Sequence, residues 1–447
     1  MKETLRAGVF RVQLPAESGW PMMGYGARTG VADACHDELY ARALCVEQGS
    51  DALLVVECDL CLLAVTQCAE LRERIAAETG LARDAICIGC IHTHSGPETG
   101  YAARVLGRPI PAWESALLDA IVEAGVAAHA ARQPARLGVG LTRAHIGRNR
   151  RCDGAPIDDR VAVVRVDRAS GEPLAIFYLH GCHPTALGHD NLAYSADWPG
   201  VASAAVELAF PGVLALFGLG AHGDVDPRTR DLLDLAIPDQ SRGVSFERMA
   251  ELGSEIAHAV VSCARGIETT AAADVAAEAH AVALEVHEAG SGAREELLEE
   301  RRVEAMAALG LESDERLRVR DFYRLEHERT AHLQIDEQRE RLACVRLYLR
   351  DLQAPLFAGG ERVSVEVQRL ALGPLELWAL PFEVTADVGL ALAARAGSRL
   401  AMPLSIANGW LRYLPHPEHF ELPGANQQYE VLNSVFPADA AQRLLRI

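Results

Sequence analysis

Two histidines at the end of a short apolar run have the residue types and spacing that most directly suggest chemistry. Residues 86–97 read ICIGCIHTHSGP, so a run typical of a buried strand ends in His92 and His94. Residues two apart on a strand share a face, so we expect both imidazoles to point the same way. The pair could bind a metal, or divide into one ligand and one acid or base. A pair of hydrogen-bonded loop histidines is the structural alternative.

Two further strand-like runs also end in potential metal ligands. Residues 174–179 lead into HGCHPT, which contains His183, and residues 375–380 lead into PFEVT, which contains Glu383. Strands that end together at one edge of a sheet build sites there, because the loops beyond them are free to carry chemistry. Two histidines and a carboxylate are typical ligands of a hydrolytic Zn²⁺, which keeps a position open for water. The pattern therefore indicates a zinc hydrolase.

Metal-assisted hydrolysis also needs a proton shuttle and donors for a developing oxyanion. The chain offers His94, Arg150, Tyr413 and Tyr429 as candidates, although spacing alone does not select them.

The elements that must position these residues predict a mixed α/β fold, with mixed β-sheets flanked by helices. The periodicity predicts helices over 67–78, 113–132, 200–209 and 246–265, and strands over 5–15, 52–57, 136–142, 161–166, 213–219 and 363–371, besides the three described above. No linker divides the chain, so we expect a single domain over 1–447. Residues 288–351 are dense in Glu and Arg and predict a helical excursion, either a solvated cover or a lid or oligomer interface.

Composition excludes several classes of function. The 447 residues carry a net charge of −19, which argues against nucleic acid or an anionic membrane surface as partner. Lys2 is the only lysine, which excludes a lysine Schiff base. The 11 cysteines lie mostly in apolar runs, as expected of buried reduced thiols. The sequence has no apolar leader and no apolar run near the ~18 residues of a membrane span, so we expect a cytoplasmic protein. We further expect that it binds a small molecule and could form a homo-oligomer.

Nine short motifs, in order, resemble the catalytic domain of the neutral (alkaline, non-lysosomal) ceramidases, which are zinc amidases. The resemblance covers roughly residues 8–265 and 360–435. The motifs are MGY (23–25), HTHSGP (92–97), NR (149–150), HPT (183–185), SADWPG (195–200), GDV (223–225), PFEVT (381–385), NGWLRY (408–413) and QQYE (427–430).

The resemblance implies a role for each matching residue. It implies a zinc site with four protein ligands, which are His92, His183, Glu383 and Tyr413. It further implies that His94 lies beside the reactive water as base or orienter, and that Arg150 and Tyr429 bind the amide oxygen and the oxyanion. Gly24 and Tyr25 would line the substrate entrance. His222, in GAHGD, could touch substrate, with a role in a turn or behind the ligands as the alternative.

Departures from the family pattern bear on mechanism and substrate. Asp226 follows GDV where some accounts of the family place a serine nucleophile, so attack by an activated water is the consistent expectation. We also expect no C-terminal β-sandwich and no signal peptide, and hence a substrate other than membrane ceramide. The predicted function is zinc-dependent hydrolysis of a linear N-acyl amide in a small hydrophobic or amphipathic molecule. Amide formation or cyclisation at the same site, and non-catalytic metal binding, are the alternatives.

Overall fold

The computed structural model of the protein describes residues 4–230, 245–286, 362–422 and 428–447, apart from residues 27, 108, 153 and 398, together with residues 332 and 334. The predicted excursion over 288–351 therefore lies outside the described residues, apart from those two positions. No helix in these ranges is long and apolar enough to cross a bilayer. The single domain over 1–447 stays a prediction.

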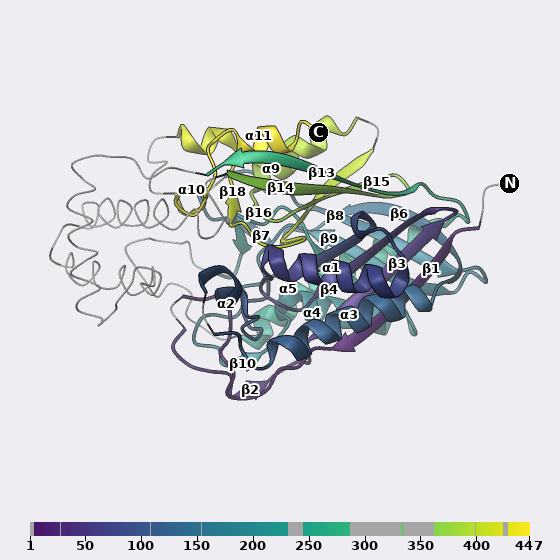
Figure 1. Ribbon diagram of the computed structural model, residues 1–447, viewed down its shortest axis with the longest axis horizontal. Coiled ribbons are helices and arrows are strands. Elements are labelled where there is room, and N and C mark those ends of the chain that lie inside the picture. Colours follow the sequence, from purple (N-terminus) through teal and green to yellow (C-terminus); the bar gives the residue numbers. More distant parts are fainter. Residues whose placement is uncertain are drawn as a thin grey trace.

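An eight-stranded mixed sheet forms the centre of the molecule (Figure 1). Its strands, from edge to edge, are β11 (Leu214–Leu219), β9 (Pro173–His180), β8 (Arg160–Arg168), β6 (Gln133–Arg143), β1 (Arg6–Gln13), β3 (Tyr40–Gln48), β4 (Asp51–Cys58) and β5 (Ile86–Cys90).

The sheet repeats one connection in its two halves. In the first half β3 and β4 are antiparallel and β5 runs parallel to β4; in the second half β8 and β9 are antiparallel and β11 runs parallel to β9. The halves join where β1 pairs with β6 at only two positions, Arg6 with Pro134 and Ala7 with Gln133. The edge strands β5 and β11 also contact each other, so the ends of strands from both halves meet.

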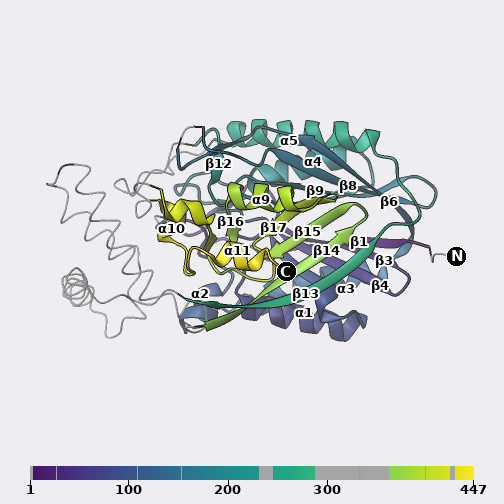
Figure 2. The same ribbon diagram turned by 90° about the horizontal axis from the view of Figure 1, so that it is seen from above.

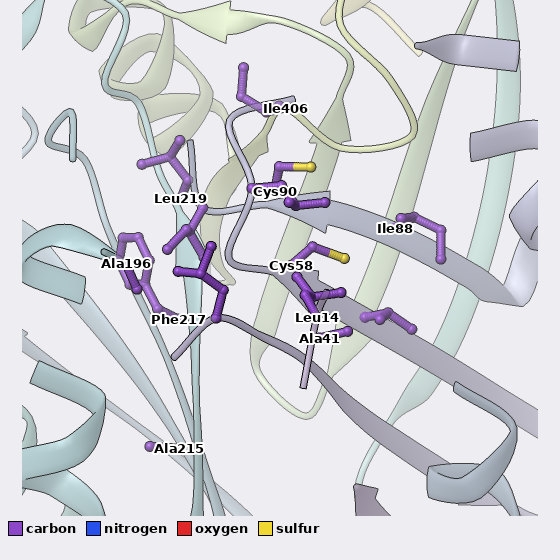
Figure 3. Packing of buried hydrophobic residues seen from close by; sticks show 14 of the residues in the cluster. Leu14, Ala41, Cys58, Ile88, Cys90, Ala196, Ala215, Phe217, Leu219 and Ile406 are labelled. Atoms are coloured by element: carbon purple, nitrogen blue, oxygen red, sulfur yellow. The ribbon is translucent and has the colours of Figure 1, made fainter. Parts of the chain in front are cut away.

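Helices cover one face of this sheet. They are α1 (Val65–Thr79), α3 (Glu114–Ala130), α4 (Asp197–Ala209) and α5 (Phe246–Gly266), and all four contribute to one buried cluster with that face. Figure 3 shows part of this cluster, where Phe217 and Leu219 of β11 lie near Cys58 and Cys90 of β4 and β5. The cysteines in the apolar runs are buried free thiols, as predicted.

A second, four-stranded sheet packs on the opposite face. It contains β13 (Val275–Glu285), β14 (Arg362–Leu372), β15 (Leu375–Leu380) and β17 (Leu400–Ser405). Residues alternate between two cores along these strands: Leu370 and Leu372 of β14 face the large sheet, while Val365 and Val367 face outward. The outward face is covered by α9 (Ala386–Arg395) and α11 (Ala440–Leu444), which lie over these strands in Figure 2. The layers form a helix–sheet–sheet–helix stack (Figure 1).

Short pairings lie beyond the ends of the main strands. They are β7 (Gly147–Asn149) with β12 (Val225–Pro227), β16 (Glu383–Val384) with β18 (Tyr413–Leu414), and β2 (Ala34–Cys35) with β10 (Ala193–Tyr194). The remaining elements are α2 (Tyr101–Leu106), α10 (Tyr429–Leu432) and the 3-10 turns η1 (Arg83–Ala85) and η3 (Pro417–Phe420).

The expectation that His92 and His94 share a strand face is wrong in its local geometry. Strand β5 ends at Cys90, and His92 adopts a left-handed backbone with φ 67°. The two rings are nearly perpendicular, with centroids 4.8 Å apart, because the chain turns there instead of continuing extended. A non-glycine residue in this region is strained and is often held in place at functional sites.

Candidate metal and catalytic site

Three strand ends deliver three histidines to one place. His92 follows β5, His183 follows β9 and His222 follows β11. His183 is further fixed because its backbone N–H donates to Val225 O of β12 at 2.9 Å. All three side chains are buried, with exposed fractions of 3%, 1% and 0%. The parallel pairing of β9 with β11 and the contact between β11 and β5 thus position the imidazoles.

The three imidazoles converge on one carboxylate oxygen. Glu383 Oε2 lies 3.1 Å from His183 Nε2, 3.5 Å from His92 Nε2 and 3.8 Å from His222 Nε2. These four donor atoms all lie within 4.8 Å of one another. Separations of this size are those expected of ligands that share one ion, since metal–ligand bonds are about 2 Å long.

The other ring nitrogen of each histidine faces a backbone carbonyl. The three distances are 2.8 Å from His92 Nδ1 to Cys61 O, 3.2 Å from His183 Nδ1 to Val225 O, and 3.1 Å from His222 Nδ1 to Gly220 O. A carbonyl can only accept, so each Nδ1 carries a proton, and each ring in its neutral form would direct the Nε2 lone pair inward. Hydrogen bonds of this kind orient the imidazole ligands of protein metal sites.

Glu383 comes from the short β16–β18 pairing, in which it lies opposite Tyr413. Its second oxygen, Oε1, accepts from Trp410 Nε1 at 3.0 Å, which leaves Oε2 for the histidines. Burial alone raises the pKa of this carboxyl, but the charge of His92 and the hydrogen bonds from His183 and His92 hold it well below its ordinary value. Glu383 is therefore an anion at neutral pH and suits a cation.

His94 lies beside the cluster on a less buried side. Its Nε2 is 3.3 Å from His92 Nε2, and the edge of its ring meets the ring of Tyr25 with centroids 4.7 Å apart. Gly24 has φ 112°, and a Cβ at this position would lie 2.4 Å from His94 Cγ, so only glycine fits there. Burial, then the positive charges of His92 and His183, hold the pKa of His94 well below its ordinary value. The neutral ring is available to accept a proton.

Arg150 extends from the end of β7 and is held on several sides. It donates to Glu430 Oε1 at 2.7 Å, to Asp226 Oδ1 at 3.2 Å and to Gly223 O at 2.6 Å. Its Nη2 also donates to Tyr413 Oη at 3.3 Å. The guanidinium therefore has a fixed position next to the residue that pairs with Glu383.

Two tyrosine rings flank this guanidinium. Arg150 Cζ lies 5.6 Å from the ring centroid of Tyr413 and 5.0 Å from that of Tyr429, and the two rings meet edge to face at 5.5 Å. Burial, and then the charge of Glu383, raise the pKa of Tyr413 well above its ordinary value, so its phenol is protonated. Arg150, Tyr413 and Tyr429 together present donors beside the histidine–carboxylate cluster.

The structure thus brings every residue that the sequence predicts for the site into two adjoining groups. His92, His183, Glu383 and His94 form the first, with Gly24 and Tyr25 against His94; Arg150, Tyr413 and Tyr429 form the second. His222, for which the sequence predicts a substrate contact or a role in a turn or behind the ligands, lies inside the first group. Trp410 and Glu430 were missed as partners of Glu383 and Arg150, although each falls inside a motif that the resemblance uses.

Comparison with known proteins confirms the family resemblance. Residues 16–233 match the family model for the N-terminal part of neutral/alkaline non-lysosomal ceramidases. Two curated relatives from Dictyostelium discoideum are neutral ceramidase A, 28% identical over 241 residues, and neutral ceramidase B, 26% identical over 240 residues. Each match covers 47% of this chain, and 34% and 33% of the respective relatives, so the chain matches about a third of their length.

Solved structures confirm the predicted mixed α/β fold. A ceramidase complexed with C2 superposes with a TM-score of 0.72 at 19% sequence identity, covering 99% of this chain and 74% of that one. The neutral ceramidase from Pseudomonas aeruginosa gives a TM-score of 0.72 at 20% identity, covering 99% and 73%. At 19–20% sequence identity these superpositions establish a shared fold and nothing more specific.

Proposed function

We propose that this relative of the neutral ceramidases is a zinc-dependent amidase, which hydrolyses a linear N-acyl amide in a small hydrophobic or amphipathic molecule. The observation that carries the proposal is the convergence of three imidazole Nε2 atoms on Glu383 Oε2 within 3.8 Å. The family resemblance supports amide hydrolysis as the reaction.

The donor set fits a divalent cation. Among the described residues no hydrogen-bond donor reaches His222 Nε2, and the nitrogens of the cluster face an anionic oxygen. Nitrogen and carboxylate donors of this kind suit Zn²⁺. His92, His183 and Glu383 would hold the ion, and the resemblance adds Tyr413, whose pairing with Glu383 keeps it close. A bound Zn²⁺ lowers the pKa of water to ~7 and polarises a carbonyl.

The chain's own residues supply the other requirements of amide hydrolysis. His94 is neutral and next to His92, so it can take a proton from the attacking water and return it to the leaving amine. Arg150 and Tyr429 would donate to the developing oxyanion, and the fixed contacts of Arg150 support this role because little reorganisation would be needed. Asp226 cannot replace a serine nucleophile, since it pairs with Arg150 and Arg230.

The entrance is proposed to lie at Gly24 and Tyr25. Tyr25 packs on His94 and its hydroxyl donates to Leu187 O at 2.7 Å, which fixes this aromatic wall beside the reacting groups. An N-acyl chain is apolar and an aromatic ring offers it a matching surface. Ceramide is the first member of the substrate class to test, because the matched relatives are named ceramidases.

The decisive experiment combines elemental analysis of the purified full chain with a panel of N-acyl amides, ceramide included, assayed before and after chelation. We expect about one Zn²⁺ per chain and hydrolysis that chelation abolishes and added Zn²⁺ restores. Glu383→Ala, purified in parallel, controls for contaminating hydrolases. Hydrolysis that persists without metal would refute the zinc mechanism, and metal without hydrolysis of any amide would refute the amidase assignment.

A further inference from the structure

His222 is the one member of the histidine cluster for which neither the motifs nor the family resemblance provides a metal-binding role. It is completely buried at the end of β11, with its ring centroid 4.6 Å from that of His183 and 5.3 Å from that of His92. Its Nε2 lies 3.8 Å from Glu383 Oε2 and has no hydrogen-bond partner within the described ranges.

The ring of His222 is held in the same way as those of His92 and His183. In all three, Nδ1 faces a backbone carbonyl, at 3.1 Å for His222, and Nε2 faces the same carboxylate oxygen. The carbonyl can only accept, so the neutral His222 ring has its proton on Nδ1 and a lone pair on Nε2. This is the tautomer and the orientation of an imidazole that binds a metal through Nε2.

A lone pair directed at an anionic carboxylate oxygen is unfavourable unless a positive charge lies between them. Leaving a buried polar atom without a partner has a cost comparable to that of a lost hydrogen bond. One cation among the four donor atoms would give His222 Nε2 a partner and would place a positive charge between the imidazoles and Glu383 Oε2. A substrate contact would satisfy His222 alone, and His94 and Tyr25 lie at the more exposed side from which substrate would enter.

We infer that His222 is a direct ligand of the bound metal, so that the ion is held by three imidazoles and one carboxylate, with or without Tyr413. This inference rests on the proposed function, which supplies the metal at this site. It assigns the third imidazole to the ion instead of to the substrate. Imidazole donors favour ions such as Zn²⁺ and disfavour Mg²⁺ and Mn²⁺, so His222 would also sharpen the selectivity of the site.

The test measures metal binding directly, in the full chain, by competition with a chromophoric chelator and by X-ray absorption at the zinc edge. The variant is His222→Leu, and His180→Leu is its matched control. His180 is likewise buried, its Nδ1 faces Arg160 O at 3.1 Å and its Nε2 has no partner among the described residues, yet it belongs to no metal cluster found there. Thermal melting of the metal-free proteins checks that both variants fold.

We expect His222→Leu to weaken Zn²⁺ binding by more than about 100-fold, beyond the ~10–100-fold typical of losing a partner that only orients a ligand. The affinity for Mn²⁺ should fall less, and His180→Leu should bind Zn²⁺ like the wild type. X-ray absorption of the wild type, which needs no variant, should show three imidazoles. Two imidazoles, or unchanged Zn²⁺ affinity in a folded His222→Leu, would overturn the inference while leaving the proposed function intact. A wild-type chain that binds no metal would overturn both.

Discussion

Trp410 donates its indole N–H to Glu383 Oε1 at 3.0 Å, so a side chain outside the histidine cluster helps to orient this carboxylate. The other oxygen, Oε2, is left facing the imidazoles. Trp410 also packs edge to face on Tyr101, with ring centroids 5.4 Å apart, which fixes the indole itself. The position of the Glu383 carboxylate therefore depends on Trp410, for which no hydrogen bond to the three histidines is found in the described part of the chain.

Removing this hydrogen bond should weaken metal binding without removing a ligand. We expect Trp410→Phe, which keeps an aromatic ring against Tyr101, to lower the affinity for Zn²⁺ by about 10–100-fold. Trp378→Phe is the matched control, since its indole donates to Glu376 at 2.8 Å, on a different carboxylate. Chelator competition measures both. Equal affinities for the two variants would show that Glu383 needs no such support.

His92 and His94 should separate metal binding from turnover. We expect His92→Ala to lose both metal and activity, because its Nε2 is one of the cluster donors. His94→Ala should keep the metal and lose about 10²–10⁴-fold in kcat, the range for removing a general acid–base group. Metal content and kcat are measured on the same preparations. If the His94→Ala protein were fully active, His94 would not be the acid–base group of the reaction.

Arg150 should contribute strongly to stability as well as to catalysis. Arg150→Met leaves Glu430 and Asp226 buried without this partner, and we expect the free energy of unfolding to fall by about 3–5 kcal/mol. The double variant Arg150→Met/Glu430→Gln should recover part of the loss, because it removes the charge that Glu430 would carry without Arg150, whereas Asp226 keeps its pairing with Arg230. Denaturant unfolding measures the free energy of unfolding of both variants, provided that its dependence on denaturant concentration (the m value) is unchanged. A double variant no more stable than the single one would show that the charge on Glu430 is not the cause.

The sequence predicts most of the central elements because their periodicity is strong and their ends are marked. The helix over 67–78 is α1, which ends at Gly80 with φ 74°, and the strand over 161–166 lies within β8. Strand β13 is not predicted from the sequence, because alanine occupies about half of its positions and the contrast between its buried and exposed residues is weak. Alanine is only weakly hydrophobic, so it contributes little to the periodicity of either a helix or a strand.

The candidate site is predictable only in part, because several of its contacts depend on tertiary pairing. Nothing in GAHGD shows that β11 runs parallel to β9, and this pairing is what brings His222 beside His183. Likewise, the partnership of Arg150 with Glu430 joins residues 280 positions apart. The motifs identify residues that share a site, and the sheet order decides which of them touch.

Asp197 provides a prediction for pH dependence away from the metal ligands. It begins α4 with φ 56°, and its carboxylate accepts from the backbone N–H groups of Ala186, Leu187 and Trp198. These bonds tie the loop that follows His183 to the helix. Burial raises the pKa of this carboxyl from 3.8 to about 6, in spite of the three hydrogen bonds, which lower it.

The sign of the effect follows from proton binding. Between pH ~4 and ~6 the folded protein holds a proton on Asp197 that the unfolded chain has released, so the contribution of this group to stability falls as the pH rises. A shift of about two units corresponds to roughly 3 kcal/mol across that window. Asp197→Asn does not titrate and tolerates the same left-handed backbone, so its stability should fall less between pH ~4 and ~6 than that of the wild type.

Urea unfolding of both proteins after chelation measures this difference, because chelation removes the separate pH dependence of metal binding. The relevant quantity is the difference between the two stability profiles, since Asn also loses one acceptor oxygen and lowers stability at every pH. Parallel profiles between pH ~4 and ~6 would contradict a raised pKa for Asp197. A wild-type profile that falls more steeply would show that the loop beside His183 is held by a carboxyl that costs stability when it ionises.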